Sequence, residues 1–258
     1  MNASAAEIEA RREYDILAPI YDRRWRRYID ATLRAILERV VFQGQERVLD
    51  IPCGTGELER MLFSRWPRLD VVGVDISPGM LRQADAKLRG ECVSWVQADA
   101  IHLPFPDEYF DCAICANSFH YFRSPLASAR EFHRVLRPGG WLVLRAAAFQ
   151  TLRSRHSQYV AERHRYRAGE LLRKLAAANF QVVRWSYANS FLSPIAWFKF
   201  RVWENLLREK PHSGVAATLP PWLNRLLLSA LRTEANLLRA GFRFVFGQSL
   251  MAVARKPK

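Results

Sequence analysis

The sequence lacks a long hydrophobic run and an apolar leader. No stretch of its 258 residues approaches the roughly 20 consecutive apolar residues that a membrane-spanning helix needs. The first twelve residues also lack the apolar core of a signal peptide. These absences predict a cytoplasmic location. We find no internal repeat or low-complexity tract, and half of the residues are apolar, which predicts a globular fold with a substantial core.

Cysteine is also scarce, and the four cysteines do not form a recognisable metal motif. Cys112 and Cys115 have the spacing of a metal or redox pair. They lie, however, in an apolar run typical of a central strand, where residues three apart face opposite sides of the sheet. No second cysteine pair and no paired histidines complete a zinc site. The pattern predicts buried structural cysteines and no metal.

Acidic residues are few in the second part of the chain. Residues 1–150 hold 20 basic and 20 acidic side chains, whereas residues 151–258 hold 19 basic and 5 acidic ones, which accounts for the whole net charge of +14. This asymmetry favours a partner with negative charge: phosphate, anionic lipid or nucleic acid. Arginine outnumbers lysine 33 to 6. An equal alternative to a charged partner is therefore that codon bias produces the arginine excess, with the arginines scattered over solvated faces.

The glycine-rich loop lacks the third glycine of a dinucleotide fingerprint. An apolar run at 48–51 leads to Gly54 and Gly56, which allow a tight turn and leave room for a ligand against the main chain. Glu59 occupies the position of the third glycine. The loop therefore predicts a nucleotide-type cofactor and disfavours a nicotinamide dinucleotide.

Two carboxylates end the next two expected strands. Asp75 lies 19 positions after Gly56, where a carboxylate can accept hydrogen bonds from both ribose hydroxyls. Asp99 ends the third strand, where it could accept a hydrogen bond from an adenine amino group. Together they indicate an adenosyl cofactor.

Four segments resemble, in order and spacing, the class I S-adenosylmethionine-dependent methyltransferases, in particular the small-molecule group called type 11. They are Leu-Asp-Ile-Pro-Cys-Gly-Thr-Gly (49–56), Gly-Val-Asp-Ile-Ser-Pro-Gly-Met-Leu (73–81), Asp-Ala-Ile-His-Leu-Pro-Phe-Pro-Asp-Glu-Tyr-Phe-Asp (99–111) and Arg-Val-Leu-Arg-Pro-Gly-Gly-Trp-Leu (134–142). Segment 14–22 is similar to the lid of that group. The resemblance extends over about 14–148 and implies S-adenosylmethionine as the cofactor.

The resemblance also implies roles for individual residues. Asp50, Gly54 and Gly56 would contact the methionine end, and Asp75 would bind ribose. The remaining cofactor residues would be Ile76 beside the adenine, Asp99 and Ala100 at its edge, Asn117 beneath the sulfonium, and Tyr14 or Tyr21 in the lid. For the two tyrosines, packing in the core is the alternative.

Alternating apolar runs and helical patterns predict an α/β fold. We expect a Rossmann-like, doubly wound, mostly parallel seven-stranded sheet with helices on both faces. The expected strands are near 47–51, 70–75, 92–97, 110–115, 140–147, 181–187 and 247–255, and the expected core helices near 56–66, 78–88, 124–136 and 168–178. The expected domains are an N-terminal helical lid (1–45), the core (46–189 and 246–258), and a helical, aromatic and basic insertion between the last two strands (190–245) that would cap the acceptor.

Catalytic and acceptor residues are less clearly marked. His120 follows the fourth strand at the rim where substrate should enter, and a histidine there can act as a general base. A packed, hydrogen-bonded histidine is the alternative. The segment after the fifth strand loosely resembles a subgroup in which it lines the acceptor pocket, which makes His156 and Tyr166 candidate substrate-binding residues.

The leading hypothesis is a methyltransferase acting on a small-molecule or lipid-like acceptor held by the insertion. The basic and aromatic insertion could also rest on an anionic membrane, which would make the protein membrane-peripheral. Two alternatives stay open. One is an RNA methyltransferase that uses the basic second part, and the other is a non-catalytic subunit that binds the cofactor for regulation.

Overall fold

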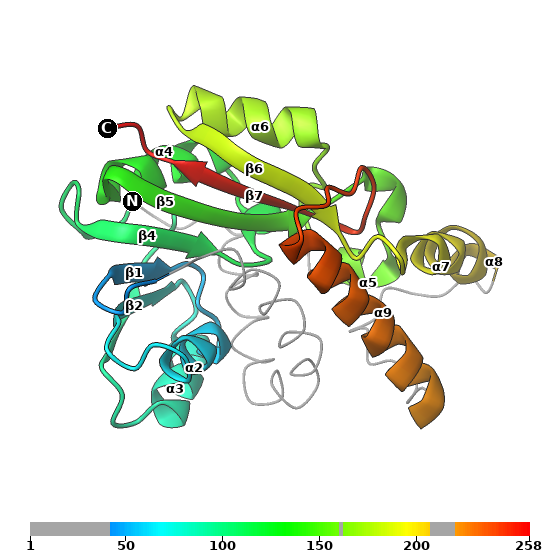
Figure 1. Cartoon of the computed structure of the whole chain (residues 1–258), viewed down its shortest axis with the longest axis horizontal. Coiled ribbons are helices and arrows are strands. Elements are labelled where there is room, and N and C mark those ends of the chain that lie inside the picture. Colours follow the sequence, from blue (N-terminus) through cyan, green and yellow to red (C-terminus); the bar gives the residue numbers. More distant parts are fainter. Residues whose placement is uncertain (1–41, 160–161, 207–219) are drawn as a thin grey trace.

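In the computed structural model, residues 42–159, 162–206 and 220–258 are described. They contain a seven-stranded sheet with the strand order β3-β2-β1-β4-β5-β7-β6 (Figure 1). The strands are β1 (Arg47–Asp50), β2 (Asp70–Asp75), β3 (Val93–Gln97), β4 (Phe110–Cys115), β5 (Leu136–Ala147), β6 (Gln181–Ala188) and β7 (Ser249–Arg255). The first five pair in parallel, and β7 runs antiparallel to β5 and β6. The predicted doubly wound sheet is confirmed.

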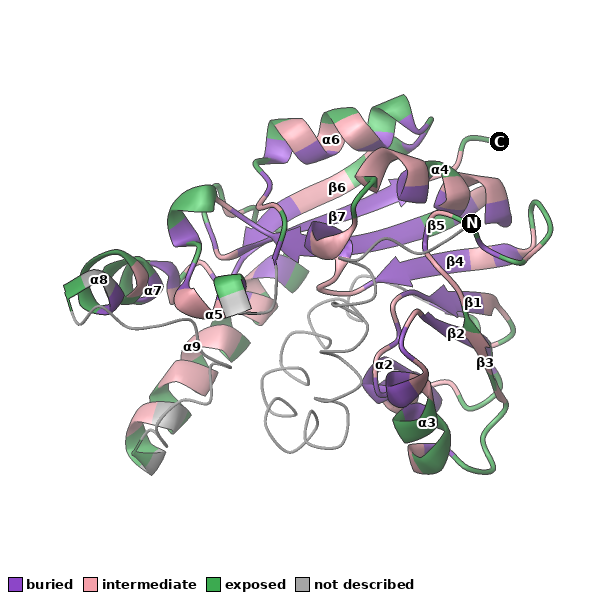
Figure 2. Ribbon diagram, turned by 180° about the vertical axis from the view of Figure 1, so that it is seen from behind, coloured by how far each residue is buried: buried purple, intermediate pink, exposed green. Residues whose placement is uncertain are grey.

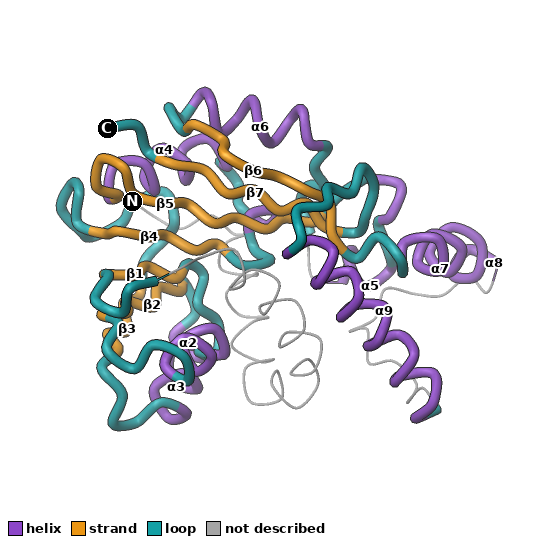
Figure 3. The backbone as a smooth tube through the Cα atoms, in the orientation of Figure 1, coloured by secondary structure: helices purple, strands orange, loops and turns teal. Residues whose placement is uncertain are grey.

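Helices connect the strands and form the insertion (Figure 3). They are α2 (Glu57–Phe63), α3 (Pro78–Lys87), α4 (Pro125–Val135), α5 (Arg155–Tyr159), α6 (Ala168–Ala177), α7 (Ser193–Phe198), α8 (Glu204–Leu206) and α9 (Pro221–Arg239), with 3-10 turns η1 (Phe119–Tyr121) and η2 (Gln150–Leu152) and a π-helical turn η3 (Lys199–Trp203). The local chemistry of α3 shows why these segments become helical: its Ser77 hydroxyl accepts from the Met80 N–H, and Pro78 occupies the first position.

The sheet is buried on both faces (Figure 2). Neighbouring strand residues point in opposite directions and therefore belong to two separate clusters of buried side chains. Leu49 belongs to the cluster that contains buried residues of α4 and α6, while its neighbour Val48 belongs to the cluster that contains buried residues of α2 and Leu238 of α9. The same alternation separates Cys115 from Cys112, which lie in the two different clusters. The prediction that these cysteines face opposite sides is confirmed.

Strand β5 begins earlier than predicted. The expected helix near 124–136 and the expected strand near 140–147 left Pro138 and Gly139 outside both elements, but β5 starts at Leu136, directly after α4. Leu136 pairs with Phe110, and the register shifts before the next pair. Gly139 takes a φ of +79° and donates its N–H to the Lys256 carbonyl. The Pro-Gly-Gly segment therefore stays in the sheet because the C-terminal end of the chain supplies a partner for it.

The insertion starts and ends at the carboxyl edge of the sheet, by which we mean the edge where β1 to β5 end. β6 also ends there, and β7 begins there because it runs antiparallel. The insertion thus leaves and rejoins the sheet at the same edge as the strand ends that carry the predicted cofactor residues, on the other side of β4 and β5 (Figure 1). The predicted domain boundaries stay predictions, and most of the proposed lid lies outside the described residues. Within the described ranges, none of the helices is long and apolar enough to cross a bilayer.

Candidate functional site

The glycine loop lies between β1 and α2, where the order of the strands reverses. Gly54 and Gly56 have φ values of +57° and +75°, so both need glycine for the turn. A Cβ at Gly56 would lie 3.1 Å from both the Ala84 Cβ and the Trp95 ring, whereas a Cβ at Gly54 would meet nothing within 4 Å. Gly56 therefore permits close packing, and Gly54 borders open space that a ligand could fill.

The Asp75 carboxylate holds this loop against the end of β2. Its Oδ2 accepts from the Gly54 N–H at 2.9 Å, and its Oδ1 accepts from the Ser77 N–H at 2.9 Å. The side chain is buried, with 6% of its surface exposed. Because each carboxylate oxygen has a second lone pair, Asp75 can hold the loop and also accept from a ligand hydroxyl.

A second carboxylate pair is buried beneath the loop. Among the described residues, Asp50 Oδ1 and both Glu59 carboxyl oxygens have no donor at hydrogen-bonding geometry. The two carboxyl groups lie close enough for each to shift the pKa of the other. Burial, followed by the neighbouring negative charge of Glu59, holds the pKa of Asp50 well above its usual range, and burial raises the pKa of Glu59 to about 8. A cation placed beside the pair would therefore stabilise the charged carboxylates and lower their pKa values.

Close packing over Gly73 fixes the position of Glu59. A Cβ at Gly73 would approach the Trp95 ring to 2.3 Å and Glu59 Oε1 to 2.8 Å. Any larger residue at this point of β2 would displace one of them. Sequence reasoning read Glu59 only as a missing glycine. Its spacing from Leu62 and Phe63, both buried on α2, could have shown that it faces inward.

The remaining cofactor candidates lie at the ends of β2 and β3. Ile76 is half-buried, and its carbonyl accepts from the Gln97 side chain at 3.3 Å. Asp99 Oδ1 accepts from the Ile101 N–H at 3.2 Å. Ala100 is buried.

Asn117 follows β4 in a left-handed conformation with φ of +58°. The chain thus turns sharply at the strand end, and the next residue, Ser118, closes the turn by donating its hydroxyl to the Ala116 carbonyl. Tyr14 and Tyr21 lie outside the described residues.

Four of these side chains form a row along the carboxyl edge. Because the strand order is β3-β2-β1-β4, the residues that follow or end these strands come in the order Asp99, Asp75, Asp50 and Asn117. Neighbouring strands are about 4.8 Å apart, so the row is about 15 Å long and suits an elongated ligand. The predicted contacts along it repeat the covalent order of an adenosyl amino acid: adenine, ribose, amino acid. The open space at Gly54 and the buried Asp50 carboxyl fit the amino-acid end.

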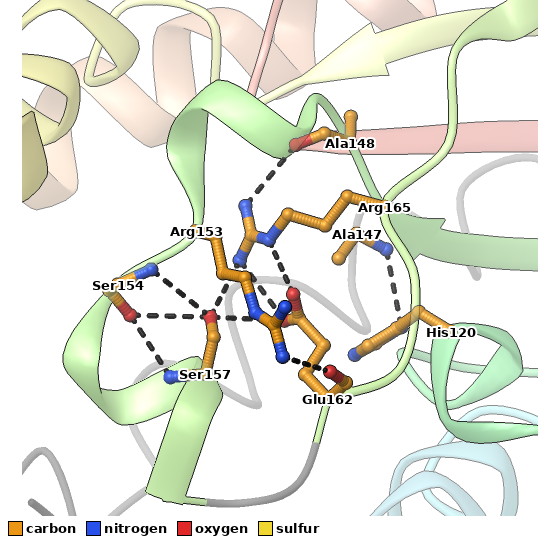
Figure 4. Close-up of polar contacts among 8 residues, drawn as sticks. All are labelled: His120, Ala147, Ala148, Arg153, Ser154, Ser157, Glu162 and Arg165. Atoms are coloured by element: carbon orange, nitrogen blue, oxygen red, sulfur yellow. Dashed lines mark hydrogen bonds and ion pairs between the residues drawn. The ribbon is translucent and has the colours of Figure 1, made fainter. Parts of the chain in front are cut away.

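His120 is buried on η1, with 7% of its surface exposed. Its Nδ1 accepts from the Ala147 N–H at 3.2 Å, so the neutral ring carries its proton on Nε2 (Figure 4). Burial, then the charges of Arg165 and Arg145, lower its pKa to about 3. A ring with its free lone pair already used is poorly suited to accept a substrate proton. The catalytic role of His120 stays an unsupported prediction.

A polar network fixes the segment after β5 (Figure 4). Its centre is the buried Glu162 carboxylate, which accepts from Arg165 and from the Ser157 hydroxyl. Arg165 also donates to the Ala148 carbonyl, and Arg153 donates to the Glu162 carbonyl at 2.9 Å. The network ties this segment to the end of β5 and so gives it a defined course at the carboxyl edge.

The structure separates the two predicted substrate-binding residues. His156 is half-buried on α5. Tyr166 is fully buried, packs its ring against Phe119 at 5.6 Å, and pairs its main chain with Ala148. Its hydroxyl has no hydrogen-bond partner among the described residues, and burial raises its pKa. Neither role is tested by these contacts, so both stay predictions.

An aromatic stack lies at the same edge, and sequence reasoning missed it as a unit. Phe149 stacks on Tyr187 at 4.8 Å and contacts Phe246 at 4.8 Å between ring centroids. Phe149 has a φ of +55°, which is rare for a bulky residue. Tyr187 is held by its hydroxyl, which accepts from the Ala168 N–H at 2.9 Å, while Phe246 is 37% exposed. The stack joins the ends of β5 and β6 to the start of β7.

In a comparison with known protein families, residues 49–144 match a family described as "Methyltransferase domain". The chain is 40% identical over 137 residues to a demethylmenaquinone methyltransferase of Thermus thermophilus, covering 51% of this chain and 59% of the relative. It is 30% identical over 131 residues to a ubiquinone/menaquinone biosynthesis C-methyltransferase of Desulfotalea psychrophila, covering 49% and 50%. The chain thus spans little more than half the length of these curated relatives.

Solved structures share the fold. An S-adenosylmethionine-dependent methyltransferase from Mesorhizobium loti has a TM-score of 0.61 at 18% identity, over 88% of this chain and 99% of that one. Haemonchus contortus phosphoethanolamine N-methyltransferase 2, in complex with S-adenosylmethionine, has a TM-score of 0.59 at 19% identity, over 94% and 60%. At these identities the likeness concerns the fold alone.

Proposed function

Because residues 49–144 form a class I S-adenosylmethionine-dependent methyltransferase domain, we propose that the protein methylates a lipophilic, quinone-like aromatic acceptor. The observation that carries the proposal is the stack of Phe149, Tyr187 and Phe246 at the carboxyl edge. Flat aromatic faces bind a planar ring by offset stacking and exclude water from it. The quinone-related names of the two relatives point to the same class of acceptor.

The stack lies at the edge of the sheet that carries the proposed cofactor contacts. β5 is the second strand from β1, about 10 Å away across the sheet. Val143 of β5 is level with Asp50, and β5 continues four residues further, so the ends of the two strands are about 16 Å apart. In our proposal Asp50, Gly54 and Gly56 hold the methionine end of the cofactor, with Asp75 at the ribose. The other contacts come from Ile76, Asp99, Ala100 and Asn117.

The chain mainly has to position the reactants and exclude water, since S-adenosylmethionine brings an activated methyl group. Transfer to a ring carbon of a hydroquinone forms one carbon–carbon bond, breaks the bond between methyl and sulfur, and releases one ring proton. The aromatic stack would hold the ring plane so that the acceptor carbon lies in line with that breaking bond. We assign no general base to His120.

The test is methyl transfer from labelled S-adenosylmethionine to a reduced, short-chain demethylmenaquinone in detergent. We expect a labelled ring-methylated product. Phe246→Ala should raise KM for the quinone about tenfold or more, because a truncated aromatic anchor costs a few kcal/mol. Its affinity for S-adenosylmethionine should stay within about twofold, because Phe246 is not among the proposed cofactor contacts. Phe198→Ala, an exposed phenylalanine outside the stack, is the matched control.

Two results would contradict the proposal. One is cofactor binding with no turnover on any hydrophobic ring acceptor, which would favour a regulatory role. The other is labelling of RNA or of hydrophilic phenols with no dependence on Phe246.

A further inference from the structure

Exposed apolar side chains are concentrated in one part of the molecule. Among the described residues, every large hydrophobic side chain classed as exposed lies between 183 and 246, with the single exception of Trp141. They are Val183, Phe191, Ile195, Trp197, Phe198, Val202, Trp203, Leu206, Trp222, Leu226, Phe242, Val245 and Phe246. In Figure 2, parts of the ribbon of α7, α8 and α9 carry the colour of exposed residues. A concentration of this kind marks a surface that contacts another phase or partner.

Among the described residues of the same segment, the exposed charges are all positive. Its two described carboxylates, Glu204 and Glu234, are each only 2% exposed. Glu234 accepts from the Ser190 and Phe191 N–H groups, and Glu204 accepts from the Arg155 N–H. The exposed charged residues in the described part of the insertion are Lys199, Arg201, Arg225, Arg232, Arg239 and Arg243.

Apolar and basic residues share the outward faces of the helices. An exposed face of α9 begins with Trp222, Arg225 and Leu226. It continues at helical spacing to Arg232 and Arg239. From α7 through η3 to α8, the exposed residues Ile195, Phe198, Val202 and Leu206 recur every three or four positions, and Trp203 is half exposed. These helices present an amphipathic surface, which we call the insertion face.

We propose that the insertion face docks onto the surface of an anionic lipid bilayer. Tryptophan and phenylalanine insert at the boundary between headgroups and acyl chains, and nearby arginine and lysine are attracted to anionic headgroups. The mixture of these two residue types on exposed helical faces is the chemistry that such a surface recognises.

The same face suits two other partners less well. A second copy of this chain would bring like positive charges together, which disfavours self-association. RNA would satisfy the charges, but the exposed aliphatic side chains of Ile195, Val202, Leu206 and Leu226 offer no ring to stack on bases. An anionic bilayer accommodates both the aliphatic and the basic residues.

Docking here has a structural consequence for the site. The insertion leaves the sheet after β6 and returns before β7, both at the carboxyl edge. A bilayer that contacts the insertion face would therefore lie beside the aromatic stack. A ring dissolved in that bilayer could then reach the stack. The docking itself does not depend on the identity of the acceptor.

The experiment is flotation of the full chain with phosphatidylcholine vesicles, with and without phosphatidylglycerol, over a salt series. We expect the protein to bind the anionic vesicles at least about tenfold more strongly than vesicles of phosphatidylcholine alone. This binding should be lost at high salt. The pair Trp203→Ser with Trp222→Ser, and separately the pair Arg225→Gln with Arg232→Gln, should each weaken binding about tenfold or more.

Matched controls separate a specific face from a general loss of charge or aromatic surface. Trp141→Ser removes an exposed tryptophan elsewhere, and Arg173→Gln removes an exposed arginine on α6. Both should leave vesicle binding unchanged. All variants should keep the affinity for S-adenosylmethionine, which shows that they are folded.

Three outcomes would overturn the proposal. The first is equal binding to neutral and anionic vesicles, or none to either. The second is a dimer of the wild-type protein in solution that the double tryptophan variant loses. The third is salt-sensitive binding of bulk tRNA together with no binding to vesicles, which would favour a surface that binds nucleic acid.

Discussion

At the scale of the residue, the carboxyl pair of Asp50 and Glu59 gives the site a titratable centre. A buried carboxyl whose pKa is raised in the folded state binds its proton more tightly there than in the unfolded chain. The folded protein then holds more protons between the unfolded pKa of Glu59, near 4.5, and its folded pKa of about 8. Stability should therefore fall as pH rises through this window, by up to about 1.4 kcal/mol per pH unit.

Glu59→Gln tests this prediction, because glutamine keeps the shape of the side chain and carries no charge. We expect the variant to lose the part of the pH dependence of unfolding between pH 5 and 8 that comes from Glu59 and to be the more stable protein at pH 8. Asp50 keeps its own part, because its pKa is raised mainly by burial. Urea unfolding at several pH values measures this. Glu57→Gln on the same helix is the control, because burial of Glu57 is outweighed by Arg60 and Lys87 and its pKa is lowered. Parallel curves of unfolding free energy against pH for the wild type and Glu59→Gln would contradict the raised pKa of Glu59.

At the scale of the element, Glu234 attaches α9 to the chain that leaves β6. Its carboxylate accepts from the Ser190 N–H at 2.6 Å and from the Phe191 N–H at 3.1 Å. Glu234→Ala would leave these N–H groups without an acceptor, at a cost of about 1–3 kcal/mol. We expect faster proteolysis within α9, with cofactor affinity kept. Asn236→Ala, an exposed site two residues further on, should change neither, and equal cleavage of both variants would refute the attachment.

The elements also show what local sequence can predict. Strands such as β2 and β4 are apolar runs bounded by turn residues, so their position could be predicted to within a residue. The early start of β5 could not, because Pro138, Gly139 and Gly140 are local helix-ending signals that pairing with β4 and the C-terminal end of the chain overrides. Tertiary pairing thus decided the one strand boundary that was wrong by several residues.

The site divides in the same way. The positions of the glycine loop, Asp75 and Asp99 could be predicted because each ends or follows a strand at a fixed spacing along the chain, while their roles at the cofactor stay predictions. The aromatic stack could not, since Phe149, Tyr187 and Phe246 meet only through the antiparallel pairing of β7 with β5 and β6. The raised pKa values of Asp50 and Glu59 likewise depend on packing between β1 and α2 that no local pattern encodes.

At the scale of the whole molecule, charge is divided between two parts. Residues 1–150 are balanced, and the excess of +14 lies in residues 151–258. The proposed cofactor contacts Asp50 and Asp75 are almost fully buried, whereas the basic residues of the insertion face are exposed. Salt screens exposed charges far more than buried ones. Ionic strength should therefore act on the two proposed binding activities very differently.

Raising sodium chloride from 0.05 to 0.5 M should lower partitioning onto anionic vesicles about tenfold or more, because several exposed arginines contribute to it. The Kd for S-adenosylmethionine, measured by calorimetry without vesicles, should change less than about threefold over the same range. Potassium acetate in place of sodium chloride should give the same two results, which excludes an effect of chloride binding. A parallel loss of both affinities would mean that the basic second part also holds the cofactor, and the division between a cofactor part and a docking part would be wrong.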